Sequence, residues 1–240
     1  MPTLAPWQWI LGALCAFMVG VAKTGMPGVG ILAIPLMVIT AGDTKSGAGW
    51  LLPILCTADV FAVFYWRRHA AAHTLFSMVP WVVVGMAGGA AALYLRETIL
   101  RPMVGIIVLT MLVLYLYRRY KSDLRPAHGG IYGMAAGFAT TVANAAGPVM
   151  NLYLLTKKLP KEEFVATGAW FFFVINLAKI PIYAWHGMLS RKSLIFDAVL
   201  VPVVLLGALT GRWLLGRVPP HIFEAIVIFM TIASTILLFR

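Results

Sequence analysis

Charge is scarce in this 240-residue sequence: Asp, Glu, Lys and Arg together make up 11% of it, whereas hydrophobic residues make up 61%. Soluble globular domains carry about 25% charged residues, so this composition excludes an ordinary soluble domain. The charged residues gather in short clusters, and the apolar stretches between the clusters are about as long as a bilayer crossing requires. We therefore expect an all-α polytopic membrane protein with few residues left for a separate soluble domain.

Other features that the sequence lacks exclude further classes. It has two cysteines, Cys15 and Cys56, and both lie in apolar segments, which excludes a disulfide framework. It contains no ATP-binding phosphate loop, no nucleophile elbow and no dinucleotide fingerprint, so we expect no cofactor and no ATP-driven pump. The net charge of +11 does not indicate nucleic acid, because the basic residues punctuate membrane segments and form no stripe. Lipid headgroups are the expected partners of these residues.

An internal repetition is the most informative positive signal. Ala48-Gly49-Trp50 reappears as Gly168-Ala169-Trp170, and the spacing of Pro80, Gly85 and Gly89 reappears about 120 residues later. A duplicated apolar chain is the usual plan of a secondary transporter, with the substrate site where the halves meet. We predict a single membrane domain made of two repeats, 1–120 and 129–240, joined by a basic linker, 121–128.

Two of the apolar segments are interrupted at matching places. The segments are about 7–41, 47–66, 74–95, 99–120, 129–156, 165–187, 193–215 and 221–239. The first segment is broken by Lys23-Thr24-Gly25-Met26-Pro27-Gly28, and the fifth by Asn144-Ala145-Ala146-Gly147-Pro148. Non-helical backbone at membrane depth is tolerated only where protein or a water-filled cavity covers it. The paired breaks therefore predict the position of a binding site.

Each broken segment is either one long kinked helix or a re-entrant hairpin, and the distribution of Lys and Arg favours the hairpin. If all eight segments cross, the two faces receive nine and eight basic residues; with two hairpins, they receive eleven and six. Three full crossings per half would then make the two repeats inverted, with both termini outside the cytoplasm. Residues 1–22 are expected to be a retained membrane segment and not a cleaved signal peptide. We predict that the hairpin tips meet near the bilayer midplane.

The tips carry the first candidate site residues. Lys23, Thr24 and Gly25 precede a run that can form a helix, and the N-terminus of a helix offers free N–H groups to an anion. Asn144 and Gly147 occupy the comparable break in the second half. The alternative is that Thr24 and Asn144 merely cap broken helices.

Two ionisable residues deep in apolar segments complete the candidate set. Lys179 lies in the sixth segment three residues after Asn176, and a shift of about 120 residues places Lys179 opposite Asp59 in the second segment. A charge at such a depth costs about 3 kcal/mol on insertion scales, so it indicates function. We expect Asn176 and Lys179 to bind an anion and Asp59 to carry a coupling proton. The alternative is a structural ion pair between Lys179 and Asp59.

A metal site is not expected. His69 and His73 stand four residues apart, but no glutamate accompanies them in a His-Glu-x-x-His pattern and they lie in a basic interfacial loop.

The ordered motifs of the chain resemble those of one family, the sulfite exporter TauE/SafE family, also called the toluenesulfonate uptake permease group. The resemblance is to the branch with a Lys-Thr-Gly-x-Pro-Gly motif, and it covers essentially the whole chain. It rests on Lys23 to Gly28, Ser46-Gly47, Leu52-Pro53, Asp59, Asn144 to Pro148, Lys161, Phe164, Thr167, Asn176, Lys179, Pro181 and Tyr183. It implies a carrier of sulfite or organosulfonates.

The expected function is secondary transport of small sulfur-containing oxyanions in a bacterial plasma (inner) membrane, with proton coupling and homo-oligomer formation left open. A proton-linked carrier of another small organic anion is the nearest rival. A membrane-embedded enzyme with Asp59 or His186 as acid–base group is the rival from another class, but no nucleophile is paired with a base at a recognisable spacing.

Overall fold

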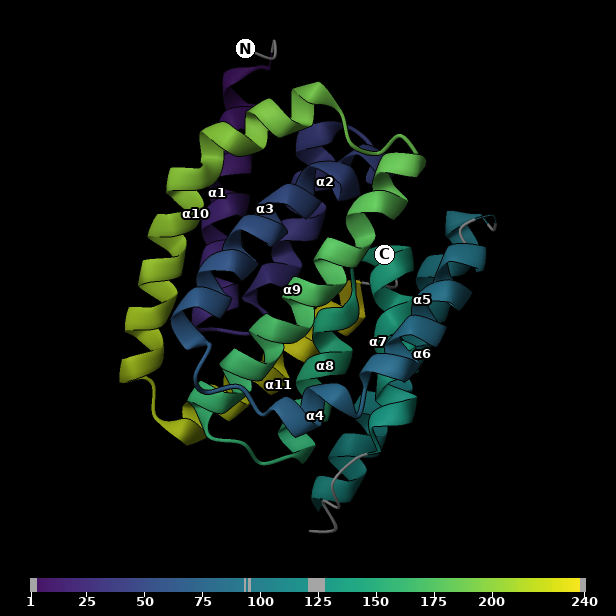
Figure 1. The fold of residues 1–240 in the computed structure, drawn as a ribbon, viewed down its shortest axis with the longest axis vertical. Helices are drawn as coiled ribbons and strands as arrows, with labels where there is room; N and C mark the ends of the chain where they lie inside the picture. The colour runs from purple at the N-terminus through teal and green to yellow at the C-terminus, as the bar shows by residue number, and fades with distance from the viewer. Residues whose placement is uncertain (1–3, 93, 95, 121–127, 238–240) are drawn as a thin grey trace.

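The computed structural model describes residues 4–92, 94, 96–120 and 128–237, and these residues form helices and connecting turns without a strand (Figure 1). Most of the predicted linker, 121–127, lies outside the described residues. The helices are α1 (Pro6–Thr24), the 3₁₀ helix η1 (Val29–Leu32), α2 (Ala33–Ala41), α3 (Thr44–Trp66), α4 (Ala72–Phe76), α5 (Val79–Ala92), α6 (Glu97–Tyr120), α7 (Gly129–Ala143), α8 (Ala146–Thr156), α9 (Lys161–Trp185), α10 (Arg191–Arg217) and α11 (Pro220–Leu237).

The first broken segment is a helical hairpin of α1, η1 and α2. α1 ends at Thr24, where the Gly-Met-Pro-Gly sequence turns the chain, and Gly28 takes a φ of 102°, which favours glycine. The side-chain amide of Gln8, near the start of α1, donates to the carbonyl of Thr40, near the end of α2, at 2.8 Å. The two arms therefore begin and end at the same end of the molecule.

The second broken segment, α7 and α8, is also a hairpin. α7 ends at Ala143, and the next residue, Asn144, adopts the left-handed conformation (φ 53°) that asparagine tolerates better than most residues. The rings of Tyr132 on α7 and Tyr153 on α8 lie 5.5 Å apart, so the arms are joined near their open end. This hairpin opens toward the end of the molecule opposite to the first one (Figure 1).

Four helices are long and apolar enough to cross a membrane: α1, α3, α9 and α10. α5, α6 and α11 contain shorter apolar stretches, Val79–Ala92, Pro102–Tyr117 and Pro220–Ile236. At 1.5 Å per residue, the 14 residues of α5 span about 21 Å, less than the roughly 30 Å of a bilayer core. The expectation of a helical, multi-spanning membrane protein is confirmed, and of these three helices α5 is clearly shorter than a typical full crossing, whereas α6 has 24 residues and α11 has 18.

Glycines bring α1 and α10 into close contact along their length. A Cβ at Gly20 would overlap the carbonyl oxygen of Val204, and a Cβ at Gly207 would overlap that of Phe17. Small residues that admit backbone-to-backbone contact are the common basis of helix packing in membranes, where apolar side chains gain nothing by leaving lipid. α1 is thereby fixed against α10, with both helices running in the same direction (Figure 1).

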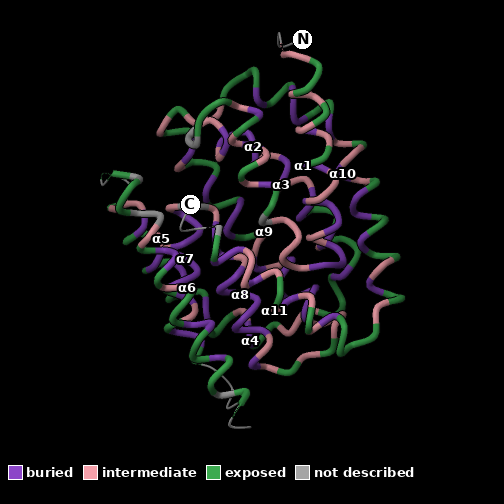
Figure 2. Tube along the Cα trace, turned by 180° about the vertical axis from the view of Figure 1, so that it is seen from behind, coloured by how far each residue is buried: buried purple, intermediate pink, exposed green. Residues whose placement is uncertain are grey.

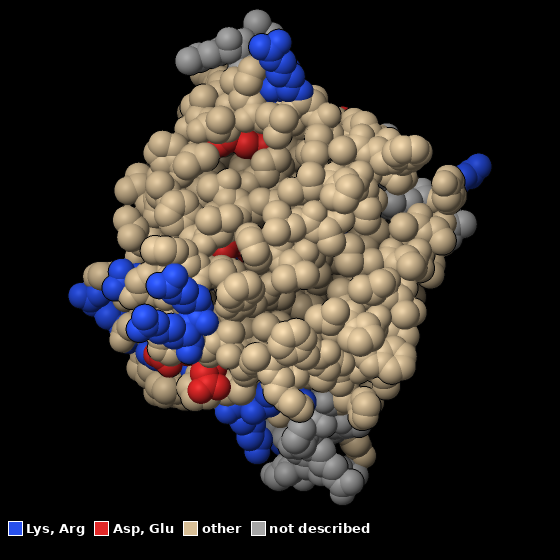
Figure 3. Space-filling view, viewed as in Figure 1, with Lys and Arg blue, Asp and Glu red and all other residues tan. Residues whose placement is uncertain are grey.

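The outer surface suits a bilayer. Exposed positions follow the outer sides of the helices, and buried positions lie toward the centre (Figure 2). Many of the exposed side chains are large and apolar, such as Phe64, Val83, Leu206 and Phe229. Lys and Arg form a few separate patches toward the edges of the view in Figure 3, and most of the surface between them carries no charged side chain. The chain is an integral membrane protein.

Candidate functional site

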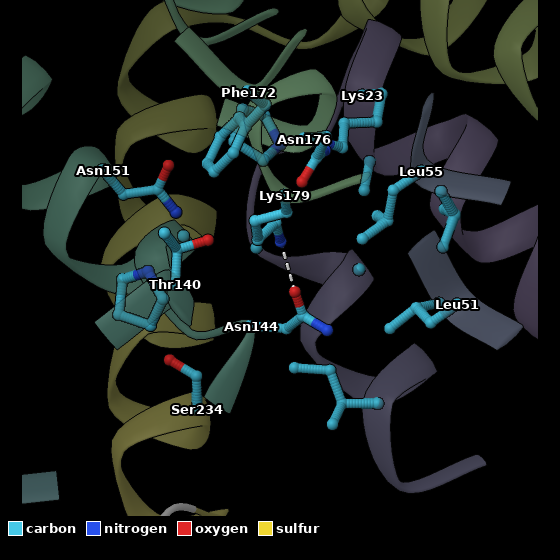
Figure 4. A pocket seen from close by; sticks show the side chains of 18 residues that line it. Lys23, Leu51, Leu55, Thr140, Asn144, Asn151, Phe172, Asn176, Lys179 and Ser234 are labelled. Atoms are coloured by element: carbon cyan, nitrogen blue, oxygen red, sulfur yellow. Dashed lines mark hydrogen bonds between the residues drawn. The ribbon is translucent and has the colours of Figure 1, made fainter. Parts of the chain in front are cut away.

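The two hairpin tips meet around a central cavity of about 100 Å³ (Figure 4). A cavity of this size holds several water molecules or one small polyatomic ion, since one water needs about 10–15 Å³ of such space. Its walls come from both hairpins and from α3, α9 and α11. They are formed by Val19, Ala22, Lys23, Pro27, Gly28, Gly30, Ile34, Leu51, Leu55, Thr140, Asn144, Gly147, Pro148, Asn151, Phe172, Asn176, Lys179 and Ser234.

Lys23 reaches across the first tip to a buried carboxylate on α3. Its ammonium lies 2.7 Å from Oδ1 of Asp59, a residue with no exposed surface, and 4.0 Å from the centroid of the Phe172 ring. The other oxygen of Asp59 accepts a hydrogen bond of 2.5 Å from Nδ2 of Asn176. Each carboxylate oxygen thus has a partner, which is what a buried charge requires.

Lys179 lies on α9 one helical turn from Asn176 and is 1% exposed. Its ammonium donates to Oδ1 of Asn144 at the second tip, as the dashed line in Figure 4 shows, and it lies 5.7 Å from the centroid of the Tyr183 ring. An amide oxygen accepts a hydrogen bond but carries no charge. Among the described residues, the ion pair of Asp59 is with Lys23, and the hydrogen bond of Lys179 is with Asn144, so this arrangement does not support the alternative of a structural Lys179–Asp59 ion pair.

The charges around the cavity do not cancel. Two ammonium groups, Lys23 and Lys179, face one carboxylate, Asp59, which leaves a surplus of one positive charge. In surroundings of low dielectric constant an unbalanced charge acts strongly on its neighbours, since the interaction energy varies inversely with the dielectric constant. A surplus of positive charge would attract an anion more strongly than a neutral molecule or a cation.

The first turn of α8 adds backbone donors on the same side. Gly147 lines the cavity, and a Cβ built on it would meet nothing within 4 Å. No side chain caps this helix. The first N–H groups of a helix lack intrahelical partners and carry the positive end of its dipole. Gly147 thus leaves the backbone accessible to a small ligand.

Thr24 and Gly25 lie outside the cavity walls, contrary to the sequence expectation. The hydroxyl of Thr24 donates to the carbonyl of Ala208 at 2.6 Å, and its own carbonyl accepts from the indole of Trp66 at 3.0 Å. A Cβ at Gly25 would overlap the carbonyl oxygen of Gly211. Both residues fasten the tip to α3 and α10, a packing role that depends on which helix lies opposite and is therefore invisible in the sequence alone.

Sequence reasoning missed several cavity residues. Thr140, Asn151 and Ser234 form a polar wall, while Leu51 and Leu55 form an apolar wall on the opposite side (Figure 4). Asn151 could have been predicted from the sequence, because a polar amide inside an apolar helix is unusual. The threonine and serine had none, since such hydroxyls commonly bond to their own helix.

A side cavity of about 30 Å³ adjoins the central one. The two share Lys23, Asn151 and Phe172, and the side cavity continues toward Phe164 near the start of α9. Phe172 therefore contributes to the walls of both cavities.

Comparison with known proteins adds one match. A family model described as "Sulfite exporter TauE/SafE" matches residues 11–238, nearly the whole chain. The searches of curated proteins and of solved structures give no match.

Proposed function

The chain belongs to the sulfite exporter TauE/SafE family, and we propose that it is a secondary transporter that moves sulfite or small organosulfonates through the central cavity. Membership of the family implies a membrane transporter of sulfur-containing anions. The choice among these anions and the residues that bind them are the finer parts of the proposal.

The observation that carries the proposal is the buried ammonium of Lys179, whose hydrogen-bond partner is the neutral amide oxygen of Asn144. A buried cation is costly unless an anion compensates it. A bound oxyanion would supply that charge. Its oxygens would accept from Lys179, from the amides of Asn144 and Asn176, and from the backbone at Gly147.

The two walls of the cavity suit a substrate that consists of a charged group and at most a short apolar part. The polar wall suits the oxygens of a sulfite or sulfonate group, and the apolar wall formed by Leu51 and Leu55 suits a short alkyl group.

Alternating access follows from the hairpins. We propose that residues 1–120 and 129–240 are inverted repeats, because each begins with a hairpin and the two hairpins open toward opposite ends of the molecule. Movement of one hairpin with its partner helices would expose the cavity to one side of the membrane at a time.

Flux into proteoliposomes tests the proposal. Vesicles with the purified protein should take up ³⁵S-labelled sulfite and methanesulfonate faster than protein-free vesicles, and unlabelled acetate and lactate should compete poorly. Vesicles with Lys179→Met serve as the matched control. Uptake no faster than in protein-free vesicles, for both sulfur anions and in both directions of the gradient, would reject the proposal.

A further inference from the structure

A second buried carboxylate lies away from the central cavity. Asp197 is on the second turn of α10, six residues and thus about 9 Å from its first residue, Arg191. The residue is 5% exposed, and neither of its carboxylate oxygens has a hydrogen-bond partner among the described residues. An ionised carboxylate in this position would have lost its water without gaining any compensation.

Among the described side chains, the helices packed against α10 provide no counter-charge. On α1, the thiol of Cys15 is close enough to interact electrostatically with Asp197, but it is neutral and donates to the carbonyl of Ala33 at 3.4 Å. The charged groups farther along α1 and α3, Lys23 and Asp59, pair with each other. On α10 itself, the ammonium of Lys192 lies 5.8 Å from the centroid of the Trp50 ring. The side chain of Lys45 on α3 is outside the described side chains.

The two acidic side chains of the interior therefore differ in kind. Asp59 has a lysine on one oxygen and an amide on the other, so it is stable as an anion. Asp197 has neither, so burial favours its neutral, protonated form. The sequence led us to expect that Asp59 carries a coupling proton. A carboxylate that a salt bridge holds as an anion is poorly suited to that role.

Asp197 is also connected to the substrate site through packing. Cys15 contacts Ala33, the first residue of α2, and the next residue, Ile34, lines the central cavity. Val19, one turn after Cys15 on α1, lines it as well. A charge that appears on Asp197 would need water, which would reach it from this end of the molecule if α10 separated from α1 or α3, or from the central cavity if the first hairpin moved. The protonation state of Asp197 is thereby linked to the position of the first hairpin.

We propose that Asp197 is the proton-binding site that couples transport to a proton gradient, a role that rests on the proposed transport function. The carboxylate takes one proton from the solution at its own end of the molecule, keeps it while α10 is packed against α1 and α3, and releases it to water of the central cavity when that cavity opens to the other side of the membrane. An O–H bond forms and the same bond breaks, so the step needs no other reactant.

Infrared spectroscopy of the purified protein tests proton binding without any substrate. The wild type at pH 7 should show the C=O stretching band of a protonated carboxylic acid in an apolar environment, and the band should disappear as the pH is raised. Exposed carboxyl groups are ionised at pH 7, with ordinary pKa values near about 4, so they do not contribute. The band should be absent in Asp197→Asn and present in Asp59→Asn and Glu162→Gln. No such band in the wild type, or an unchanged band in Asp197→Asn, would overturn the proposal.

Transport of ³⁵S-sulfite then tests coupling. In the wild type, a pH gradient should drive uphill accumulation above the level in protein-free vesicles, whereas in Asp197→Asn the ratio of accumulation with and without the gradient should fall to one. Counterflow at equal pH should persist in Asp197→Asn, because the amide mimics the protonated acid. Gradient-driven accumulation by Asp197→Asn, loss of its counterflow, or wild-type accumulation that ignores the gradient would each overturn the coupling role. If the wild type moves no sulfite, the proposed function fails, while the infrared titration still decides whether Asp197 binds a proton.

Discussion

The two hairpin tips reach the same cavity, but their residues are held in opposite ways. At the first tip, Lys23 has a carboxylate partner, and Gly25 is pressed against the backbone of α10. At the second tip, Asn144 contacts the unpaired cation Lys179, and Gly147 has open space beside it. The first tip is thus fastened to its surroundings, whereas the second presents charge and backbone to the cavity. We propose that the polar residue at the first helix break serves structure, whereas the one at the second serves ligand binding.

The largest expected loss of stability comes from breaking the ion pair of the first tip. Lys23→Met leaves Asp59 buried without its counter-charge, which should cost about 3–5 kcal/mol in the free energy of unfolding. The double variant Lys23→Met/Asp59→Asn should recover most of that loss, since no stranded charge remains. Thermal unfolding in detergent measures both. A single variant as stable as the wild type would show that the first tip is not held by this pair.

Gly25→Ala probes the packing of the same tip. The added methyl group would overlap the backbone of Gly211, which cannot move as a flexible side chain can, so the protein should lose about 1–3 kcal/mol of stability. Gly216→Ala is the matched control, since a Cβ there meets nothing within 4 Å and the change keeps α10 helical. Equal unfolding midpoints for the two variants would contradict the contact.

At the second tip, Gly147→Ala should leave stability unchanged and slow transport. A methyl group fits without contact but stands where a ligand would approach the first turn of α8. Loss of one backbone hydrogen bond of about 1 kcal/mol corresponds to roughly a fivefold rise in KM for sulfite. Initial rates in proteoliposomes measure it, and an unaltered KM would remove the backbone of α8 from the site.

The smallest effect is expected at Phe172, whose ring touches Lys23. Phe172→Leu removes a cation–π contact worth about 0.5–1 kcal/mol, so KM for sulfite should rise by roughly two- to fivefold. Phe173→Leu is the control, because Phe173 packs against Trp170 and does not line the cavity. If Phe173→Leu raises KM as much as Phe172→Leu, the effect comes from general loosening of α9 and not from Lys23.

The sequence predicted the positions of the two hairpins better than the roles of the residues at their tips. Gly and Pro in Lys23–Gly28 and Asn144–Pro148 are local signals of a helix break, so both hairpins could be located from residues alone. The partner of Asp59 could not be found in this way. An offset between repeats aligns Asp59 with Lys179 along two helices, but it does not say which third helix brings a lysine between them, and α1 brings Lys23.

The sequence also could not show that Asp197 is buried without a hydrogen-bond partner. Asn151 and Asp197 are both polar residues in apolar helices, a signal that the sequence contains. Whether such a residue faces a cavity, as Asn151 does, or a neighbouring helix, as Asp197 does, depends on the rotation of each helix in the bundle. That rotation is set by long-range packing, such as the contact of α1 with α10, and not by local sequence.

The most direct test of the account is equilibrium binding of sulfite to the purified protein, measured by calorimetry for the wild type, Lys179→Met and Lys179→Met/Asp59→Asn. Because Lys179 supplies the surplus positive charge, removing its ammonium should weaken binding by on the order of 100-fold, which corresponds to about 3 kcal/mol for a charged hydrogen bond. The double variant should bind no better than the single one, since Asp59 is the partner of Lys23. Sulfite binding of wild-type strength by folded Lys179→Met would contradict the account.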